Sequence, residues 1–160
     1  MIFVTTGTQA PFDRLIMTVD SMAHMLPGVE IIAQTTRTSY QVRNMSSYNF
    51  LPPSEFNSLF KRAELIVSHA GMGTIISALV QEKPILVMPR LAKNGEHRND
   101  HQLATARALD KLKYVHAAYT AEELEFKILE LAKCEQKRMH KIGDSASVEL
   151  ITSLRTFINS

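Results

Sequence analysis

The chain has 160 residues, of which 45% are hydrophobic and 21% charged, and this composition is typical of one globular domain. A formal charge of +2, from 18 basic and 16 acidic side chains without blocks of like charge, excludes a strong electrostatic attraction to nucleic acid. A chain of this length is too short for two nucleotide-binding domains of ordinary size. Chemistry in a cleft between two such domains therefore requires a second chain.

Short β-branched runs alternate with segments of helical period, which is typical of βαβ units and a mostly parallel sheet. Residues 2–6 predict a buried strand, and the regularly spaced apolar side chains of the next segment, up to Met22, predict a helix of roughly four turns. Residues 29–33 predict a second strand. A weaker third strand lies within 48–51, and a short helix capped by Ser54 follows it.

The middle of the chain predicts one compact βαβ unit, with strands at 64–68 and 85–88 on either side of a helix at 74–82. After a polar loop, the pattern predicts further elements, namely a helix at 99–112, a strand at 114–117, a helix after the capping box at 120–123, and a final helix at 147–158. We therefore expect a single domain over residues 1–160, with C-terminal helices at about 120–160. Its class is α/β, with a Rossmann-like, doubly wound, mostly parallel sheet that binds ligands beyond the carboxyl ends of the strands.

The opening residues 1–6 contain neither a basic n-region nor an apolar h-region. The single cysteine, Cys134, cannot form an intrachain disulfide. The longest clean apolar runs, such as 85–88, are far shorter than the about 20 residues that cross a bilayer. We expect a cytoplasmic protein that reaches the membrane peripherally or through a partner.

Two predicted turns combine glycine with hydroxyl residues at strand ends, namely 5–9 (Thr-Thr-Gly-Thr-Gln) and 69–74 (His-Ala-Gly-Met-Gly-Thr). Glycine lets backbone amides approach an anion closely, and a helix N-terminus carries about half a positive charge. A phosphate or pyrophosphate therefore fits here without a lysine. The alternative is a pair of tight turns with threonine caps.

The usual nucleotide fingerprints are absent. Ile76 stands where a dinucleotide-binding motif would place its third glycine, and no acidic residue ends the next strand, so NAD binding has weak support. No P-loop motif occurs in the chain.

The segment 95–102 (Gly-Glu-His-Arg-Asn-Asp-His-Gln) is densely polar. His97 and His101 stand at i and i+4 and could share a helix face as metal ligands, but Arg98 occupies the place of the glutamate in the usual zinc motif. A second alternative is a solvated helix start. We favour hydrogen bonding to a polyhydroxyl ligand, because Asp, His and Gln together supply donors and acceptors.

With these motifs in order, residues 1–118 resemble the donor-binding, C-terminal domain of glycosyltransferase family 28, and most closely its split members. The resemblance is carried by four segments: Phe3-Val4-Thr5-Thr6-Gly7-Thr8 with Phe12-Asp13-Leu15-Ile16, Ile66-Val67-Ser68-His69-Ala70-Gly71-Met72-Gly73-Thr74-Ile75, Lys83-Pro84-Ile85-Leu86-Val87-Met88-Pro89-Arg90, and Glu96-His97 with Asp100-His101-Gln102. It implies one half of the two-domain GT-B fold.

The resemblance also implies which residues bind substrate. The glycine turn should face the diphosphate, His69 and the Gly7 turn should line the nucleotide cleft, and the polar segment should reach the donor sugar. The full set is Gly7, Thr8, His69, Ala70, Gly71, Met72, Gly73, Thr74, Glu96, His97, Asp100, His101 and Gln102. Ser77 stands where many relatives carry an acidic residue for the ribose hydroxyls.

The resemblance implies that the chain is the UDP-sugar-binding catalytic subunit of an inverting glycosyltransferase, and that this enzyme needs no metal and no cofactor. It would transfer a hexose to a lipid-linked oligosaccharide in exopolysaccharide or capsule biosynthesis, together with a membrane-anchored acceptor-binding subunit. The general base is expected on that partner, so no catalytic residue is assigned. Galactose, glucose, glucuronate and N-acetylglucosamine all remain open as the sugar. An exposed apolar cleft edge is expected to bind the acceptor subunit or, in the isolated chain, a second copy in a homo-oligomer.

Two alternatives belong to other functional classes. The chain could be a non-catalytic nucleotide-binding module, such as a regulatory or scaffold subunit. It could also be a small NAD-type oxidoreductase, which would bind NADH and not UDP.

Overall fold

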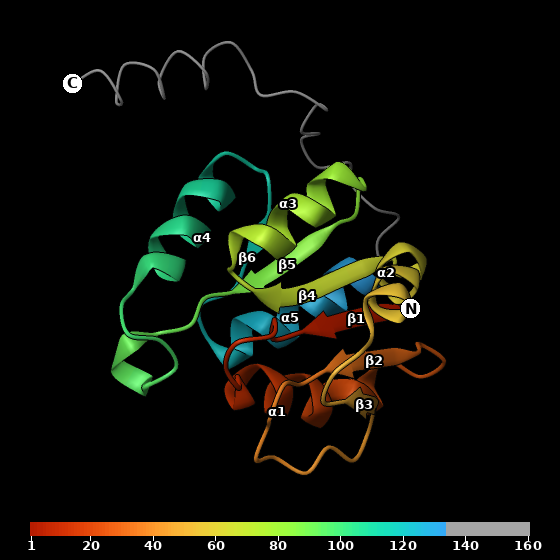
Figure 1. Cartoon of the computed structure of the whole chain (residues 1–160). Helices are drawn as coiled ribbons and strands as arrows, with labels where there is room; N and C mark the ends of the chain where they lie inside the picture. The colour runs from red at the N-terminus through yellow and green to blue at the C-terminus, as the bar shows by residue number, and fades with distance from the viewer. Residues whose placement is uncertain (134–160) are drawn as a thin grey trace, which may run out of the picture.

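The computed structural model describes residues 1–133, which form a six-stranded parallel sheet in the order β3-β2-β1-β4-β5-β6 (Figure 1). The strands are β1 (Ile2–Thr5), β2 (Ile31–Gln34), β3 (Ser46–Tyr48), β4 (Leu65–His69), β5 (Ile85–Met88) and β6 (His116–Ala117). The chain builds outward from β1 to β3 and then returns to place β4 on the other side of β1. The predicted doubly wound α/β class is therefore confirmed, and its topological switch point lies between β1 and β4.

Helices cover both faces of the sheet (Figure 1). On one face, α1 (Asp13–Met22) and α5 (Ala121–Lys133) bury one core with alternate residues of β1, such as Val4. On the other face lie α2 (Pro53–Arg62), α3 (Met72–Val80) and α4 (His101–Lys111), where Phe3 meets the rings of Phe56 and Phe60 at centroid distances of 5.2 and 6.2 Å. Successive residues of β1 thus enter different cores because strand side chains alternate between faces.

Several predicted element bounds are wrong by one to three residues. The third strand lies at Ser46–Tyr48 and not within 48–51, because the prolines that follow belong to the start of α2, where a proline at the first helical position is well accommodated. Ser54 is consequently not a cap, since the N-cap residue is Pro52. The predicted final helix at 147–158 and Cys134 lie outside the described residues.

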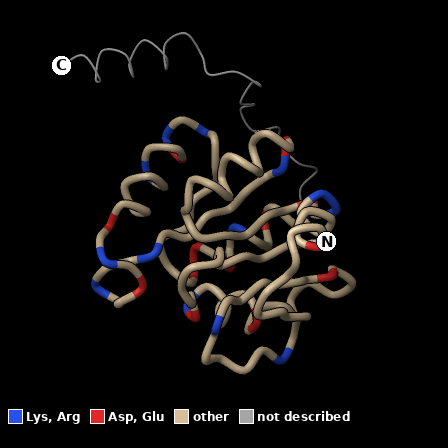
Figure 2. Tube along the Cα trace, in the orientation of Figure 1, with Lys and Arg blue, Asp and Glu red and all other residues tan. Residues whose placement is uncertain are grey.

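Charged residues of both signs are scattered over the fold, as the near balance of acidic and basic side chains predicts (Figure 2). Within residues 1–133, none of the helices combines the length and the apolar character that crossing a membrane requires.

Candidate functional site

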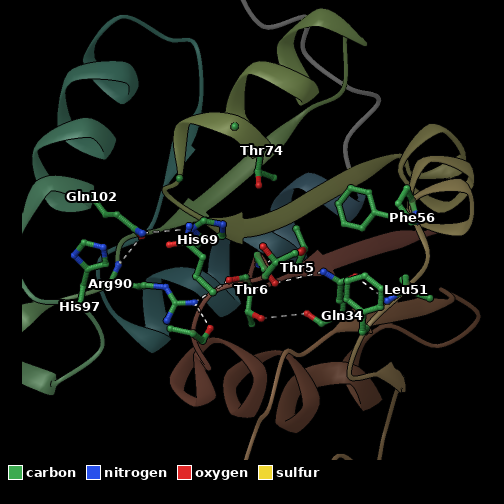
Figure 3. A pocket seen from close by; sticks show the side chains of 18 of the residues that line it. Thr5, Thr6, Gln34, Leu51, Phe56, His69, Thr74, Arg90, His97 and Gln102 are labelled. Atoms are coloured by element: carbon green, nitrogen blue, oxygen red, sulfur yellow. Dashed lines mark hydrogen bonds between the residues drawn. The ribbon is translucent and has the colours of Figure 1, made fainter.

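A pocket of about 540 Å³ opens at the carboxyl ends of β1 and β4, which is the switch point of the sheet (Figure 3). This volume is in the range of small-molecule sites, and the location is where open α/β sheets bind ligands. The pocket is lined by Thr5, Thr6, Gly7, Thr8, Gln9, Ala10, Gln34, Phe50, Leu51, Pro53, Phe56, Asn57, His69, Gly71, Gly73, Thr74, Arg90, His97 and Gln102.

Eight of the thirteen expected substrate-binding residues line this pocket, namely Gly7, Thr8, His69, Gly71, Gly73, Thr74, His97 and Gln102. Segments that are far apart in the sequence therefore meet, as the two glycine turns and the polar segment predict. The other five, Ala70, Met72, Glu96, Asp100 and His101, do not line it.

The glycine turn after β4 leads directly into α3. Gly71 is the N-cap residue and provides no side-chain cap, so the first N–H groups of α3 have no side-chain acceptor. A Cβ built on Gly73 would meet nothing within 4 Å, so open space borders the backbone there. Met72 is 48% exposed on α3, and Ala70 is buried in the core, which explains why neither reaches the pocket.

The turn after β1 differs from the turn after β4. Gly7 has a φ of +79°, a conformation that favours glycine, but α1 begins only at Asp13. The Asp13 carboxylate already occupies the first turn of α1 and accepts hydrogen bonds from Thr38 and Ser39. Although partial burial opposes this, these hydrogen bonds lower the pKa of Asp13. Of these two turns, the one before α3 is the better anion site.

Arg90 joins the loop after β1 to the loop after β5. Its guanidinium is buried, with the residue 3% exposed, and its Nη2 donates to the carbonyls of Thr6 at 2.8 Å and Ala10 at 2.6 Å. Nη1 donates to Pro11, and the guanidinium lies 4.7 Å from the centre of the Phe12 ring. In the sequence, Arg90 ends the motif that begins at Lys83, and nothing local indicates these distant partners.

Gln34, at the end of β2, is a second buried residue that sequence reasoning missed. Its Oε1 accepts the N–H of Leu51 at 3.0 Å, and its Nε2 donates to the carbonyl of Gly7 at 3.4 Å. Gln34 therefore ties the Gly7 turn to the opposite wall of the pocket. That wall is apolar and includes Phe56 and Phe50, the latter 64% exposed.

His69 is the last residue of β4 and lies between the two glycine turns (Figure 3). A Cβ at Gly7 would lie 2.7 Å from His69 Nε2, and a Cβ at Gly71 would lie 2.1 Å from its Cε1. Both glycines are therefore needed to accommodate the imidazole. Burial, aided by the positive charge of Arg90, lowers the pKa of His69 from 6.5 to about 4, so the ring is neutral at pH 7.

Glu96 has a structural role beside the pocket. Both of its carboxylate oxygens accept from Arg14, at 2.7 and 2.8 Å, and one also accepts the N–H of Leu91. Burial opposes ionisation, but the hydrogen bonds from Arg14 and Leu91 lower the pKa of Glu96. Asp100 likewise accepts the N–H of Ala92 at 2.8 Å.

The idea that His97 and His101 share a helix face as metal ligands is wrong, because α4 begins only at His101. His97 lies in the preceding loop, where its Nδ1 contacts Asn99, while His101 is exposed. In the described part of the chain, no group of three or more His, Cys, Asp or Glu side chains is placed to hold a metal ion. Ser77 donates to the carbonyl of Gly73 at 2.8 Å and is not among the lining residues.

None of the described residues that line the pocket is aspartate or glutamate. Within the lining, an anionic ligand would therefore meet the uncapped start of α3 and the guanidinium of Arg90 without a carboxylate. Outside the lining, the negative charge of Glu96 acts on Arg90. The pocket is suited to a ligand that combines an anionic group with an apolar or aromatic group.

The chain is similar to known glycosyltransferase proteins. Residues 1–153 match the family model described as the glycosyltransferase family 28 C-terminal domain. The UDP-N-acetylglucosamine transferase subunit ALG13 of Candida albicans is 38% identical over 72 residues, which are 45% of this chain and 23% of that protein. The human subunit of the same name is 32% identical over 121 residues, or 69% of this chain and 10% of that protein. The chain thus spans less than a quarter of either relative's length.

Solved structures share the fold. The NMR solution structure of ALG13 has a TM-score of 0.59 at 20% identity, covering 99% of this chain and 96% of that one. The kitacinnamycin glycotransferase has a TM-score of 0.62 at 20% identity, covering 83% of this chain and 35% of that one. This chain therefore shares its fold with the ALG13 structure and with part of the larger enzyme.

Proposed function

The chain belongs to the glycosyltransferase family 28 C-terminal domain family, and we propose that it is the donor-binding subunit of a glycosyltransferase that uses a UDP-sugar. The observation that carries the proposal is a pocket free of carboxylates at the switch point of the sheet, beside a helix start that lacks a side-chain cap. The relatives named as UDP-N-acetylglucosamine transferase subunits support both the donor class and the status of a subunit.

The diphosphate belongs at the start of α3 in this proposal. The N–H groups next to Gly73 would donate to its oxygens, and the positive charge of Arg90 would lower its energy. Departure of UDP develops negative charge on the β-phosphate, so the same donors stabilise the transition state more than the ground state. This role of the backbone requires neither a metal nor a cofactor.

The nucleoside belongs along the apolar wall. Phe50 offers an exposed aromatic ring beside Leu51 and Phe56, and such a surface suits a flat base. The polar side of the pocket, with His97 and Gln102, is then left for the sugar end of the donor.

The finer identity of the reaction is also a proposal. The names of the relatives favour N-acetylglucosamine as the donor sugar, with galactose, glucose and glucuronate as competitors to be tested. The acceptor would be a lipid-linked saccharide that a membrane-anchored partner presents on the cytoplasmic side. Assembly of an exopolysaccharide or capsule stays a prediction, without support from these names.

Calorimetric titration with UDP, UDP-N-acetylglucosamine and NADH tests the proposal. We expect saturable binding of the first two ligands and none of NADH. Gly73→Asp places a carboxylate at the proposed diphosphate position and should weaken binding roughly tenfold or more. Met25→Asp adds the same charge at an exposed site outside the lining and should bind as the unmodified protein does.

Three results would contradict the proposal. If UDP does not bind, the chain does not contain the proposed donor site. Tight binding of NADH in its place would favour an oxidoreductase. Saturable UDP binding without sugar transfer, when every candidate acceptor subunit is supplied, would favour a regulatory or scaffold module.

A further inference from the structure

The orientation of the His69 imidazole is fixed by the two glycines that flank it. Side chains at Gly7 or Gly71 would come within 2.7 and 2.1 Å of ring atoms, so the backbone contacts the ring from both sides. The ring cannot tilt far without meeting one of these turns. Its two nitrogens therefore keep different surroundings, with Nδ1 toward Gln102 and Nε2 as the ring nitrogen nearest Gly7 (Figure 3).

The amide of Gln102 has a defined orientation as well. The backbone N–H of Arg90 donates to Gln102 Oε1 at 3.2 Å, and a backbone N–H can only donate. The amide oxygen thus faces Arg90, and the amide nitrogen faces His69 Nδ1 at 3.4 Å. Because an amide NH₂ group can only donate, Nδ1 must accept, and the single proton of the neutral imidazole lies on Nε2.

A second proton on the ring is disfavoured at neutral pH. Burial has the largest effect in lowering the pKa of His69 to about 4, and the basic side chains of Arg90 and His97 lower it further. His69 is therefore a neutral donor through Nε2, and among the described residues no hydrogen-bond acceptor contacts that nitrogen.

We propose that Gln102 is a positioning residue that holds His69 in the Nε2–H tautomer, so that this N–H donates to an anionic oxygen of the nucleotide diphosphate. The identity of the acceptor rests on the proposed function, whereas the tautomer does not. This role is additional to the sugar contact implied by the family resemblance. The Arg90 N–H and His69 Nδ1 each take one bonding position of the Gln102 amide, which keeps a second N–H and a second oxygen lone pair.

The substitution Gln102→Glu changes the group that faces His69 Nδ1 from a hydrogen-bond donor to an acceptor. A carboxylate can still accept the Arg90 N–H with one oxygen, but its second oxygen requires a proton on Nδ1. The ring must then become the Nδ1–H tautomer, with a lone pair on Nε2, or take up a second proton. Asn57→Asp is the matched control, because it adds the same charge to the pocket lining from α2, without a hydrogen bond to His69.

The tautomer is measured on the full-length, ligand-free protein labelled with ¹⁵N-histidine, by long-range ¹H–¹⁵N correlation at pH 7.5. The signals of His69 are identified by their loss in His69→Gln. We expect an unprotonated Nδ1 and a protonated Nε2 in the unmodified protein and in Asn57→Asp, and a protonated Nδ1 in Gln102→Glu. A protonated Nδ1 in the unmodified protein, or an unchanged Nδ1 in Gln102→Glu, overturns the proposal.

Calorimetry on the same proteins tests the acceptor. UDP affinity should fall roughly tenfold or more in Gln102→Glu relative to Asn57→Asp, since an N–H donor to a charged oxygen is replaced by a lone pair. Equal affinity of the two variants would overturn the diphosphate contact. If the unmodified protein shows the expected tautomer but does not bind UDP, the proposed function fails while the positioning role of Gln102 stands.

Gln102→Met provides the same test if Gln102→Glu does not fold. Methionine keeps the approximate shape of the side chain but has no amide. Residue 102 then favours neither the protonated nor the unprotonated form of His69 Nδ1. We expect Nδ1 and Nε2 signals between the two protonation states. A pure Nε2–H tautomer in this variant would show that Gln102 does not set the tautomer.

Discussion

Gly71 and Gly73 are two residues apart in one turn, yet a side chain would meet different surroundings at each. A methyl group at Gly71 would collide with the His69 ring, which Gly7 prevents from moving away. At Gly73, in the first turn of α3, nothing lies within 4 Å. The two glycines of this motif therefore serve different needs, room for an imidazole in one case and room for a ligand in the other.

We predict opposite effects of alanine at these positions on the free energy of unfolding. Gly71→Ala should lower it by about 1–3 kcal/mol through overpacking against the ring. Gly73→Ala should raise it by up to about 1 kcal/mol, because alanine is the better helix former. Urea denaturation of both variants at pH 7.5 measures the difference. Equal effects would show that His69 does not occupy the space beside Gly71.

His69 also predicts a pH dependence of stability. Its pKa is about 4 in the folded chain and 6.5 in a model peptide, so the unfolded state binds the extra proton between these values. Its contribution to the free energy of unfolding is complete above pH 6.5 and is lost as the pH falls, by roughly 3 kcal/mol at pH 4.

Urea denaturation between pH 7.5 and 4.5 measures this effect, with His69→Gln and the exposed control His24→Gln. We expect His69→Gln to show a shallower loss of stability than the unmodified protein, and His24→Gln to follow the unmodified protein. His116, whose pKa burial also lowers, contributes equally to all three proteins. Parallel curves for all three would contradict a partly buried, neutral His69.

At the scale of elements, α1 holds the long connection from β2 to β3. Asp20 on α1 is completely buried and accepts hydrogen bonds from the Tyr40 hydroxyl at 2.8 Å, the Arg43 N–H at 3.1 Å and the Asn44 N–H at 2.7 Å. Asp13 holds the start of the same connection. In this loop, the two carboxylates accept backbone N–H groups that a helix or sheet would otherwise pair.

We predict that Asp20→Ala lowers the free energy of unfolding by roughly 3 kcal/mol, because several donors lose a charged acceptor. Trypsin should then cleave more rapidly after Arg37 or Arg43, which are exposed in this loop. Glu130→Ala, an exposed carboxylate on α5, should stay within about 0.5 kcal/mol of the unmodified protein. Unchanged proteolysis in Asp20→Ala would mean that the loop is held by other contacts.

The elements that could be predicted from the sequence are those with local signals. The β4-α3-β5 unit is predicted by a β-branched run, a glycine turn and a proline directly before the second strand, which all lie close together in the sequence. Strand β3 was misplaced because its three residues, Ser46–Tyr48, are polar and exposed and show no apolar alternation. Pairing with β2 determines this strand, and such pairing is not encoded locally.

The site could be predicted only in part, for the same reason. The turns that line it contain glycine and hydroxyl residues that are recognisable by eye. The roles of Arg90 and Gln34 depend on partners 84 and 17 residues away, and neither residue type is unusual in a loop or strand. The family resemblance places Glu96 with the polar segment in the substrate site, whereas the structure pairs its carboxylate with Arg14 on α1.

At the scale of the whole molecule, the described lining of the pocket suits an anionic ligand but offers no strong proton acceptor. The described residues that line it include no carboxylate, and a neutral His69 with a pKa of about 4 is a poor proton acceptor at pH 7. In the proposed function, a group from the acceptor-binding partner deprotonates the acceptor hydroxyl. We predict negligible sugar transfer by this chain alone when it is supplied with UDP-N-acetylglucosamine and a lipid-linked acceptor.

Addition of a membrane-associated acceptor-binding subunit should restore transfer, which release of UDP would measure. Gly73→Asp combined with the same subunit is the control and should release UDP roughly tenfold or more slowly at a donor concentration below saturation. Full activity of the unmodified chain without a second protein would refute the division of labour between two chains.

The contacts of Arg90 have a consequence for the kinetics of ligand binding. Three carbonyls of the loop after β1, those of Thr6, Ala10 and Pro11, all accept from one buried guanidinium, so this wall is already ordered before a ligand arrives. Binding then loses little loop entropy, and encounter does not have to wait for a segment to close. Nucleotides should associate in a single fast phase, and donors that differ only in their sugar should differ mainly in how long they stay bound.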